Sequence, residues 1–224
     1  MHTILFDIDG TLLRCGGAGL SAIGQVMGQL FGVKQLGKVP VHGRTDEGIL
    51  NELFEQSSLV FDDYRDEFNE KYWAKLAETL GESPSYLLPG IPTLLEQLDS
   101  RKDVALGILT GNSERAAEVK LRHFNLGHFF EFGGYGDFHS DRNDVAKLAL
   151  AAARNFLGER FDSTKVWVIG DTVNDILCAR AISAKVIAVE TGGASMSELK
   201  AAEPDLVMPS LDDHRLFFEA LELV

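Results

Sequence analysis

Four short apolar runs constrain what this chain can fold into. They cover residues 2–6, 104–109, 166–169 and 186–189, and each is followed by a segment with helical periodicity. None of them alternates polar with apolar residues, which is typical of strands buried on both faces. Parallel strands need crossover connections, so such strands separated by helices predict an α/β fold in which helices cover both faces of a parallel sheet. Residues 206–208 predict an edge strand, and residues 131–132 mark a further short strand.

The connection that follows the first strand is much longer than a crossover requires. Residues 7–103 contain no convincing buried strand, although a crossover helix needs only about a dozen residues. Most of this stretch has amphipathic helical spacing, and the sequence Gly81-Glu82-Ser83-Pro84 ends it. We therefore expect a small helical cap at residues 16–83, inserted into a core formed by residues 1–15 and 84–224.

Composition argues against several classes of function. The chain has 224 residues, is 45% hydrophobic and carries a net charge of −13, which argues against binding to nucleic acid or to anionic membranes. Its apolar runs are too short to span a bilayer, and no basic region precedes the first strand, so we expect neither a membrane segment nor a secretory signal. Two cysteines without a Cys/His cluster indicate the reducing cytoplasm rather than a disulfide framework or structural zinc.

The first strand ends in two carboxylates. Asp7-Ile8-Asp9-Gly10-Thr11 follows the apolar run, and residues i and i+2 of a strand point to the same side. Asp7 and Asp9 are therefore expected to lie together, where their mutual repulsion favours a divalent cation. A turn is the alternative interpretation of Asp-Gly after an apolar run. From these residues alone, a catalytic site and a turn both remain open.

Polar groups also follow two later strands. Thr-Gly-Asn occupies residues 110–112, and Gly-Asp-Thr-Val-Asn-Asp occupies residues 170–175, while Ser-Asp-Arg-Asn at 140–143 precedes the latter strand. The functional crevice of an open α/β sheet lies outside the carboxyl ends of its strands. The pattern therefore predicts two more carboxylates, a hydroxyl group and a cation at the sheet edge that holds Asp7 and Asp9.

With these motifs in this order, the chain resembles the haloacid dehalogenase (HAD) superfamily, in its capped phosphatase branch, and is similar to phosphoglycolate phosphatases. The signature is Asp-x-Asp-Gly-Thr, then Ser or Thr, then Lys or Arg, then Gly-Asp-x-x-x-Asp, and it covers essentially the whole chain. The resemblance implies a Rossmann-like three-layer core, a mobile cap, and a Mg²⁺-dependent phosphatase of a small phosphorylated metabolite. Asp9 disfavours a dehalogenase, because that branch lacks the second aspartate.

The resemblance also implies roles for the acidic residues. Asp7 would attack phosphorus and form an aspartyl-phosphate. Asp9 would protonate the leaving oxygen and later accept a proton from water, and we expect crowding by carboxylates to raise its pKa. Mg²⁺ would be held by the Asp7 carboxylate, the Asp9 backbone carbonyl and Asp171, with Asp175 supporting the metal site one helical turn later.

The phosphoryl group would be bound by residues from two further motifs. Thr110, Gly111 and Asn112 would contact its oxygens, and a cation would complete the clamp. Many relatives have Lys-Pro at the cationic position, where this chain has Arg142 followed by Asn. Lys147 is the alternative, but we prefer Arg142 because it falls at a loop-to-helix junction, whereas Lys147 lies inside an apolar helical pattern.

One loop of the predicted cap holds a further candidate. Family members often place substrate contacts in the loop that matches residues 42–46, so Arg44 is a candidate for a second anionic group of the substrate. The alternative is a solvated arginine, with Thr45 or Asp46 capping the next helix.

Two other functions share this fold. A phosphomutase of the β-phosphoglucomutase type would use the same core chemistry and is the alternative enzyme. A non-catalytic regulatory protein is the alternative from another class, although it would have no need of Asp7, Asp9 and Asp171.

Overall fold

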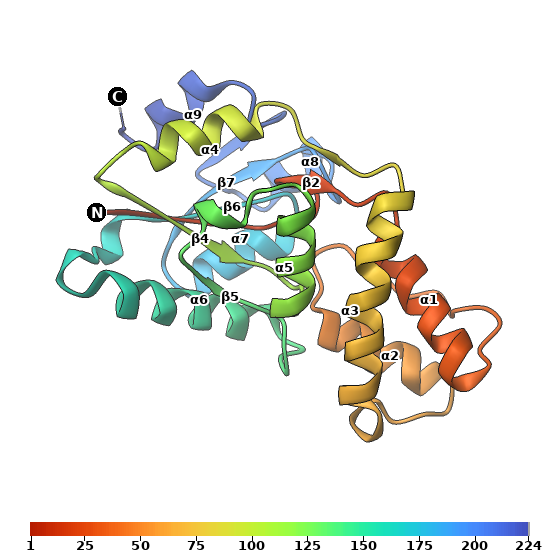
Figure 1. The fold of residues 1–224 in the computed structure, drawn as a ribbon. Helices are drawn as coiled ribbons and strands as arrows, with labels where there is room; N and C mark the ends of the chain where they lie inside the picture. Colours follow the sequence, from red (N-terminus) through yellow and green to blue (C-terminus); the bar gives the residue numbers. More distant parts are fainter. Residues whose placement is uncertain (224) are drawn as a thin grey trace.

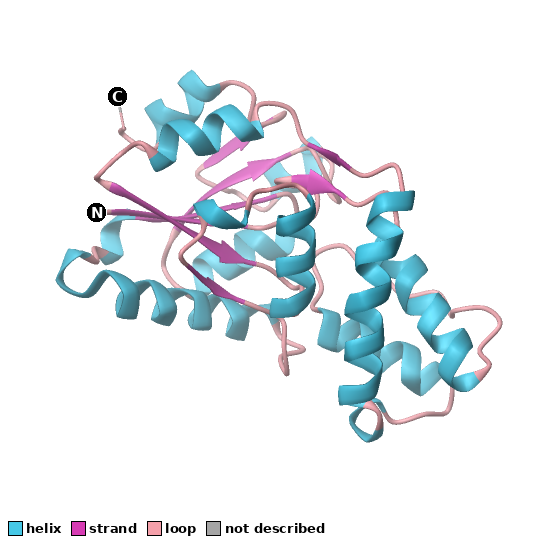
Figure 2. Cartoon of the chain, viewed as in Figure 1, coloured by secondary structure: helices cyan, strands magenta, loops and turns pink. Residues whose placement is uncertain are grey.

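A computed structural model of the protein describes residues 1–223. Its main sheet is parallel, with the strand order β5-β4-β1-β6-β7-β8 (Figures 1 and 2). The strands are β1 (His2–Phe6), β4 (Val104–Leu109), β5 (Phe132–Gly134), β6 (Val166–Gly170), β7 (Lys185–Val189) and β8 (Leu206–Met208). The predicted parallel α/β fold is confirmed, with β8 at one edge and the weakly marked β5 at the other.

Helices cover both faces of this sheet, because most side chains of the central strands are apolar on either side. The α-helices of the described chain, some of which lie beside the sheet and not on it, are α1 (Ala18–Phe31), α2 (Asp46–Gln56), α3 (Arg65–Glu82), α4 (Ile91–Asp99), α5 (Glu114–His123), α6 (Arg142–Leu157), α7 (Val173–Ala181), α8 (Met196–Ala201) and α9 (His214–Ala220). One face packs on α4, α5 and α9, and receives Ile4 and Phe6 of β1. The other face packs on α6, α7 and α8, and receives Leu5. The pleat of the strand thus divides one apolar run between two cores.

Strand β1 lies in the middle of the sheet, between β4 and β6. Phe6 is in register with Ile108 of β4 and Ile169 of β6. The residues that follow these three strands therefore emerge side by side at one edge of the sheet. This register brings together the polar segments that lie far apart in the sequence.

Helices α1, α2 and α3 stand beside the sheet at its right in Figure 1. They enclose an apolar core of their own, with Met27, Phe54, Phe68 and Leu76 among its fully buried side chains. The chain leaves and re-enters the main domain through the antiparallel pair β2 (Leu13–Arg14) and β3 (Tyr86–Leu87). We did not predict this pair, because two-residue strands are too short to show periodicity. None of the helices described between residues 1 and 223 has the length and apolar character needed to cross a membrane.

Candidate active site

The turn after β1 places the first two candidate carboxylates. The backbone amide of Asp7 donates to the carbonyl of Ile169 at 2.9 Å, which extends the sheet by one residue. The chain then bends at Gly10, whose φ is +87°. A Cβ atom at Gly10 would lie 2.6 Å from Oδ2 of Asp171. Glycine is therefore required here, both for the left-handed backbone and for the close approach of a carboxylate.

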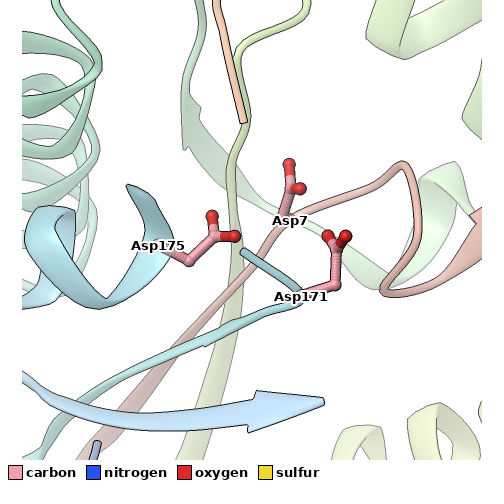
Figure 3. A group of neighbouring side chains, drawn as sticks. All are labelled: Asp7, Asp171 and Asp175. Atoms are coloured by element: carbon pink, nitrogen blue, oxygen red, sulfur yellow. The ribbon is translucent and has the colours of Figure 1, made fainter. Parts of the chain in front are cut away.

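Three buried carboxylates meet at the edge of the sheet. Asp7 follows β1, Asp171 follows β6, and Asp175 lies in the first turn of α7 (Figure 3). Each has an oxygen within 4.8 Å of the others. Burial raises the pKa of Asp7 to about 6 and that of Asp171 to about 8, and repulsion from neighbouring carboxylates adds to both shifts. Oxygen ligands under this repulsion fit a hard divalent cation such as Mg²⁺.

The cation of the site is Arg142, at the start of α6. It is 7% exposed, and its Nη2 lies 3.1 Å from Oδ1 of Asp7 while also pairing with Asp175. Asp175 is held in turn by the backbone amide and hydroxyl of Thr172, which donate to its Oδ2 at 2.9 and 2.7 Å. Lys147 instead pairs with Asp144, and its side chain is 62% exposed. The structure thus places Arg142 in the site and Lys147 on the surface.

The Nε atom of Arg142 is the donor that the site leaves unused. This atom is buried and has no hydrogen-bond partner among the described residues. Leaving a buried donor unpaired costs about 1–3 kcal/mol, so such groups call for a partner. An oxygen of a bound anion would supply one.

Thr110, Gly111 and Asn112 follow β4 at the same edge. Thr110 and Asn112 are buried, and the Asn112 amide donates to Oγ1 of Thr110 and to Oδ2 of Asp9, both at 2.8 Å. The carbonyl of Gly111 accepts from the backbone amide of Asp46, in the first turn of α2, at 2.7 Å. These three residues therefore connect the carboxylates of the core to the helical segment formed by α1, α2 and α3.

Lys120 is a member of the site that we did not predict. It lies on α5, is 5% exposed, and donates from Nζ to Oδ2 of Asp9 and to Oδ1 of Asn112, both at 2.6 Å. The sequence held one signal for its burial. Lys120 falls on the same face of an otherwise polar helix as the buried residues Ala116, Ala117 and Leu121. A lysine at that spacing must find a partner in the interior.

The pKa of Asp9 shifts opposite to our prediction. Burial alone would raise it, but the Lys120 ammonium and the donors on Asn112 and Cys15 outweigh burial and hold the pKa below its ordinary value. We expected crowding by carboxylates to dominate. That expectation was wrong because Asp9 pairs with a cation contributed by a different element, Lys120 on α5.

Comparison with known proteins identifies the family. The model of the haloacid dehalogenase-like hydrolases matches residues 4–189. The chain belongs to this family. The chain is 26% identical over 216 residues to a phosphoglycolate phosphatase of Nitrosococcus oceani, covering 93% of this chain and 92% of the relative. It is 32% identical over 128 residues to that of Synechococcus elongatus, a match that spans 57% of either chain. The family resemblance predicted from the motifs is confirmed.

Solved structures agree with the fold of this HAD-like hydrolase. CbbY from Rhodobacter sphaeroides in complex with phosphate superposes with a TM-score of 0.73 at 20% identity, over 95% of this chain and 96% of that one. A putative phosphatase from Clostridium difficile superposes with a TM-score of 0.66 at 21% identity, over 100% and 98% of the two chains. At this level of identity the likeness concerns the fold.

Arg44 does not reach the carboxylate cluster with its charged group. Its Nη1 pairs with Glu52 at 2.6 Å and donates to the carbonyl of Pro40 at 3.2 Å, and its Nη2 donates to the carbonyl of Gly48 at 3.1 Å. Thr45 caps α2, with its hydroxyl accepting from the Gly48 amide at 3.1 Å. The alternative that we gave for this loop, a helix cap at Thr45, is the one found. Arg44 nevertheless lines the cavity beside the carboxylates, so a contact between Arg44 and substrate stays a prediction.

A cavity of about 540 Å³ lies between the sheet edge and the helical segment. The core contributes Asp7, Asp9, Lys120 and Arg142, among others, to its lining. The helices contribute apolar side chains, namely Leu20, Ile23, Ile49 and Tyr72. A concave site with a few convergent charged groups and an apolar wall suits a small organic ligand.

Gly111→Ala is expected to disturb the contact between the helical segment and the site. A Cβ atom there would lie 2.0 Å from the backbone carbonyl oxygen of Arg44, so the segment must shift. Displacements of about 1 Å can cost ~10²-fold in rate, and we expect kcat/KM for p-nitrophenyl phosphate to fall roughly 10- to 100-fold. Gly81→Ala on α3 is the control, because a Cβ atom added there would meet no neighbouring residue within 4 Å. An unchanged kcat/KM in Gly111→Ala would contradict this expectation.

Proposed function

We propose that this protein is a Mg²⁺-dependent phosphatase that hydrolyses a small phosphorylated metabolite through an aspartyl-phosphate on Asp7. The observation that carries the proposal is the buried cluster of Asp7, Asp171 and Asp175 beside Arg142, at the carboxyl edge of the sheet. Buried carboxylates that repel one another next to an arginine with an unused donor suit a cation and an oxyanion together. Membership of the hydrolase family, and curated relatives named as phosphatases, support this reading.

The reaction would proceed in two steps. A carboxylate oxygen of Asp7 attacks phosphorus, and the bond from phosphorus to the ester oxygen breaks as Asp9 gives a proton to that oxygen. Asp9 must carry that proton when the step begins, although Lys120 holds its pKa below the ordinary value in the unliganded site. Water then attacks the phosphorus of the aspartyl-phosphate while Asp9 takes a proton from it. The bond to Asp7 breaks, inorganic phosphate leaves, and both aspartates return to their starting states.

The surrounding residues would stabilise charge on the phosphoryl oxygens. Arg142 can donate from the Nε that is otherwise unpaired, and Thr110 and Asn112 lie at the end of the neighbouring strand. Asp175 would keep Arg142 in place through their ion pair. Asp7, Asp171 and the Asp9 backbone carbonyl would hold Mg²⁺, which neutralises charge on the nucleophile and the phosphoryl oxygens when bound.

The relatives and the cavity support a choice of substrate class to test. Curated relatives are named phosphoglycolate phosphatases, and the cavity of about 540 Å³ suits a metabolite of small size. We therefore place 2-phosphoglycolate first among the substrates to be tested. A phosphomutase would use the same nucleophile, but no observation on this chain favours transfer to a second sugar hydroxyl over transfer to water.

Metal removal tests the proposal directly. Phosphate release is measured from p-nitrophenyl phosphate and from a panel of phosphorylated metabolites that includes 2-phosphoglycolate. We expect turnover with Mg²⁺, a loss of roughly 100-fold or more after treatment with EDTA, and recovery when Mg²⁺ is added back, because several kcal/mol of charge stabilisation depend on the metal. Absence of phosphate release from every ester with Mg²⁺ present would refute the proposed function.

A further inference from the structure

Asp9, Asn112 and Lys120 form a closed ring of hydrogen bonds. Lys120 Nζ donates to both Asp9 and Asn112 at 2.6 Å, and the Asn112 amide donates to Asp9 at 2.8 Å. The three residues come from the turn after β1, the loop after β4 and the helix α5. The ring fixes Asp9 relative to Thr110, which accepts the second hydrogen bond of the Asn112 amide.

Lys120 is suited to hold a carboxylate firmly. Its side chain leaves α5 two turns after the start of the helix and reaches back toward the amino end, as side chains on helices do. The side chain is 6% exposed, whereas that of Asp9 is 41% exposed and lines the cavity. A buried ammonium thus anchors a carboxylate that remains accessible to a ligand.

The same ring holds the Asp9 side chain apart from the cluster of three buried carboxylates. Asp7, Asp171 and Asp175 share one space, while the side chain of Asp9 lies outside that group. Both of its oxygens are occupied elsewhere, Oδ2 by Lys120 and Asn112, and Oδ1 by the thiol of Cys15 at 3.2 Å. Arg142, which lines the same cavity as Asp9 and already pairs with Asp7, is a cation that could attract the Asp9 carboxylate if the charge of Lys120 were removed.

We propose that Lys120 is a positioning residue. It holds the Asp9 carboxylate on the leaving-group side of the cavity, away from the carboxylate cluster of Asp7, Asp171 and Asp175. This inference rests on the proposed function, because it assigns to Lys120 the task of orienting the proton donor. Fixing the donor in advance removes the cost of ordering it in the transition state. Lys120 acts through Asp9 and Asn112 and takes no part in bond formation.

Lys120→Met tests the inference, because methionine keeps an unbranched apolar stem and removes the charge. Two esters are compared, p-nitrophenyl phosphate, whose leaving group needs little protonation, and the alkyl phosphate that the panel ranks highest. General acids contribute about 10²- to 10⁴-fold. We expect kcat/KM to fall roughly 100-fold for the alkyl ester and less than about 10-fold for the nitrophenyl ester. Lys147→Met, on the exposed face of α6, is the matched control and should change neither value.

A double-mutant comparison separates positioning from a structural role. Asp9→Asn should show the same dependence on the leaving group, and adding Lys120→Met to it should cost no more than about threefold further, because residues that act as a unit are not additive. Equal losses on the two esters, or fully additive losses, would overturn the inference. Inactivity of the unmodified protein on every ester would instead refute the proposed phosphatase.

A crystal structure of Lys120→Met provides a readout that does not depend on turnover. The Asp9 carboxylate is expected to leave Asn112 and turn toward Arg142. An Asp9 side chain that keeps its orientation in this variant would show that Lys120 does not position it.

Discussion

Asp7→Asn is expected to reduce phosphate release by about 10³-fold or more. Asparagine has the same shape but is a poor nucleophile, and losses of this size are usual when an enzyme loses its nucleophile. The substitution also removes one of three buried carboxylates that lie within 4.8 Å of one another. It should therefore relieve repulsion, so we expect no fall in the melting temperature of the metal-free protein.

Kinetic assays with p-nitrophenyl phosphate, paired with thermal melts, check this prediction. Asp99→Asn, at the exposed end of α4, is the matched control and should retain full activity. Trapping supplies an independent measurement, because a brief reaction with labelled substrate should transfer phosphate to the unmodified protein and not to Asp7→Asn. Full activity in Asp7→Asn would eliminate the mechanism.

Arg142→Ala should have the second largest effect, a fall in kcat/KM of roughly 10²- to 10³-fold. Removing one preorganised donor to developing charge typically costs that much. The variant should also be less stable by about 3–5 kcal/mol, because it leaves the buried carboxylate of Asp175 without its cation. Arg142→Lys keeps the charge but lacks the planar guanidinium, whose Nη2 contacts both Asp7 and Asp175. Its activity should therefore fall between that of Arg142→Ala and that of the unmodified protein.

Lys147→Ala provides the contrast on the same helix. Its ammonium pairs with Asp144 at the surface, an interaction that contributes little to stability, and we expect activity within about twofold of the unmodified protein. Parallel measurement of kcat/KM and of unfolding in urea separates lost catalysis from lost folding. If Lys147→Ala were the more damaged of the two, the assignment of Arg142 as the phosphate-binding cation would be wrong.

The strands were predictable because their pattern is local. Residues 4–6 and 104–109 are apolar on both faces, and a parallel sheet covered by helices buries such strands in full. The same reasoning located the polar groups, since Asp7, Thr110 and Asp171 each follow a strand directly. Register in the sheet then brings these groups to one edge, as expected for residues at equivalent ends of neighbouring parallel strands.

The contacts between elements were not predictable in this way. Lys120 lies 111 positions from Asp9 in the sequence, and the residues around either one do not predict that the two form an ion pair. That pair reverses the expected direction of the Asp9 pKa shift. Arg44 is a further case, because only the tertiary contacts show that its guanidinium pairs with Glu52 on the following helix while the residue lines the cavity.

The sequence by itself thus determined the sheet and the strand ends at which the acidic groups emerge, because periodicity and strand termination are properties of neighbouring residues. Only the tertiary structure decided which cation meets which carboxylate. The strength of an ion pair depends on the distance between the two groups and on their burial, which the fold sets. The packing of α5 and α6 against the sheet brings Lys120 to Asp9 and Arg142 to Asp7. The two aspartates of the first motif, alike in sequence, acquire opposite pKa shifts for this reason.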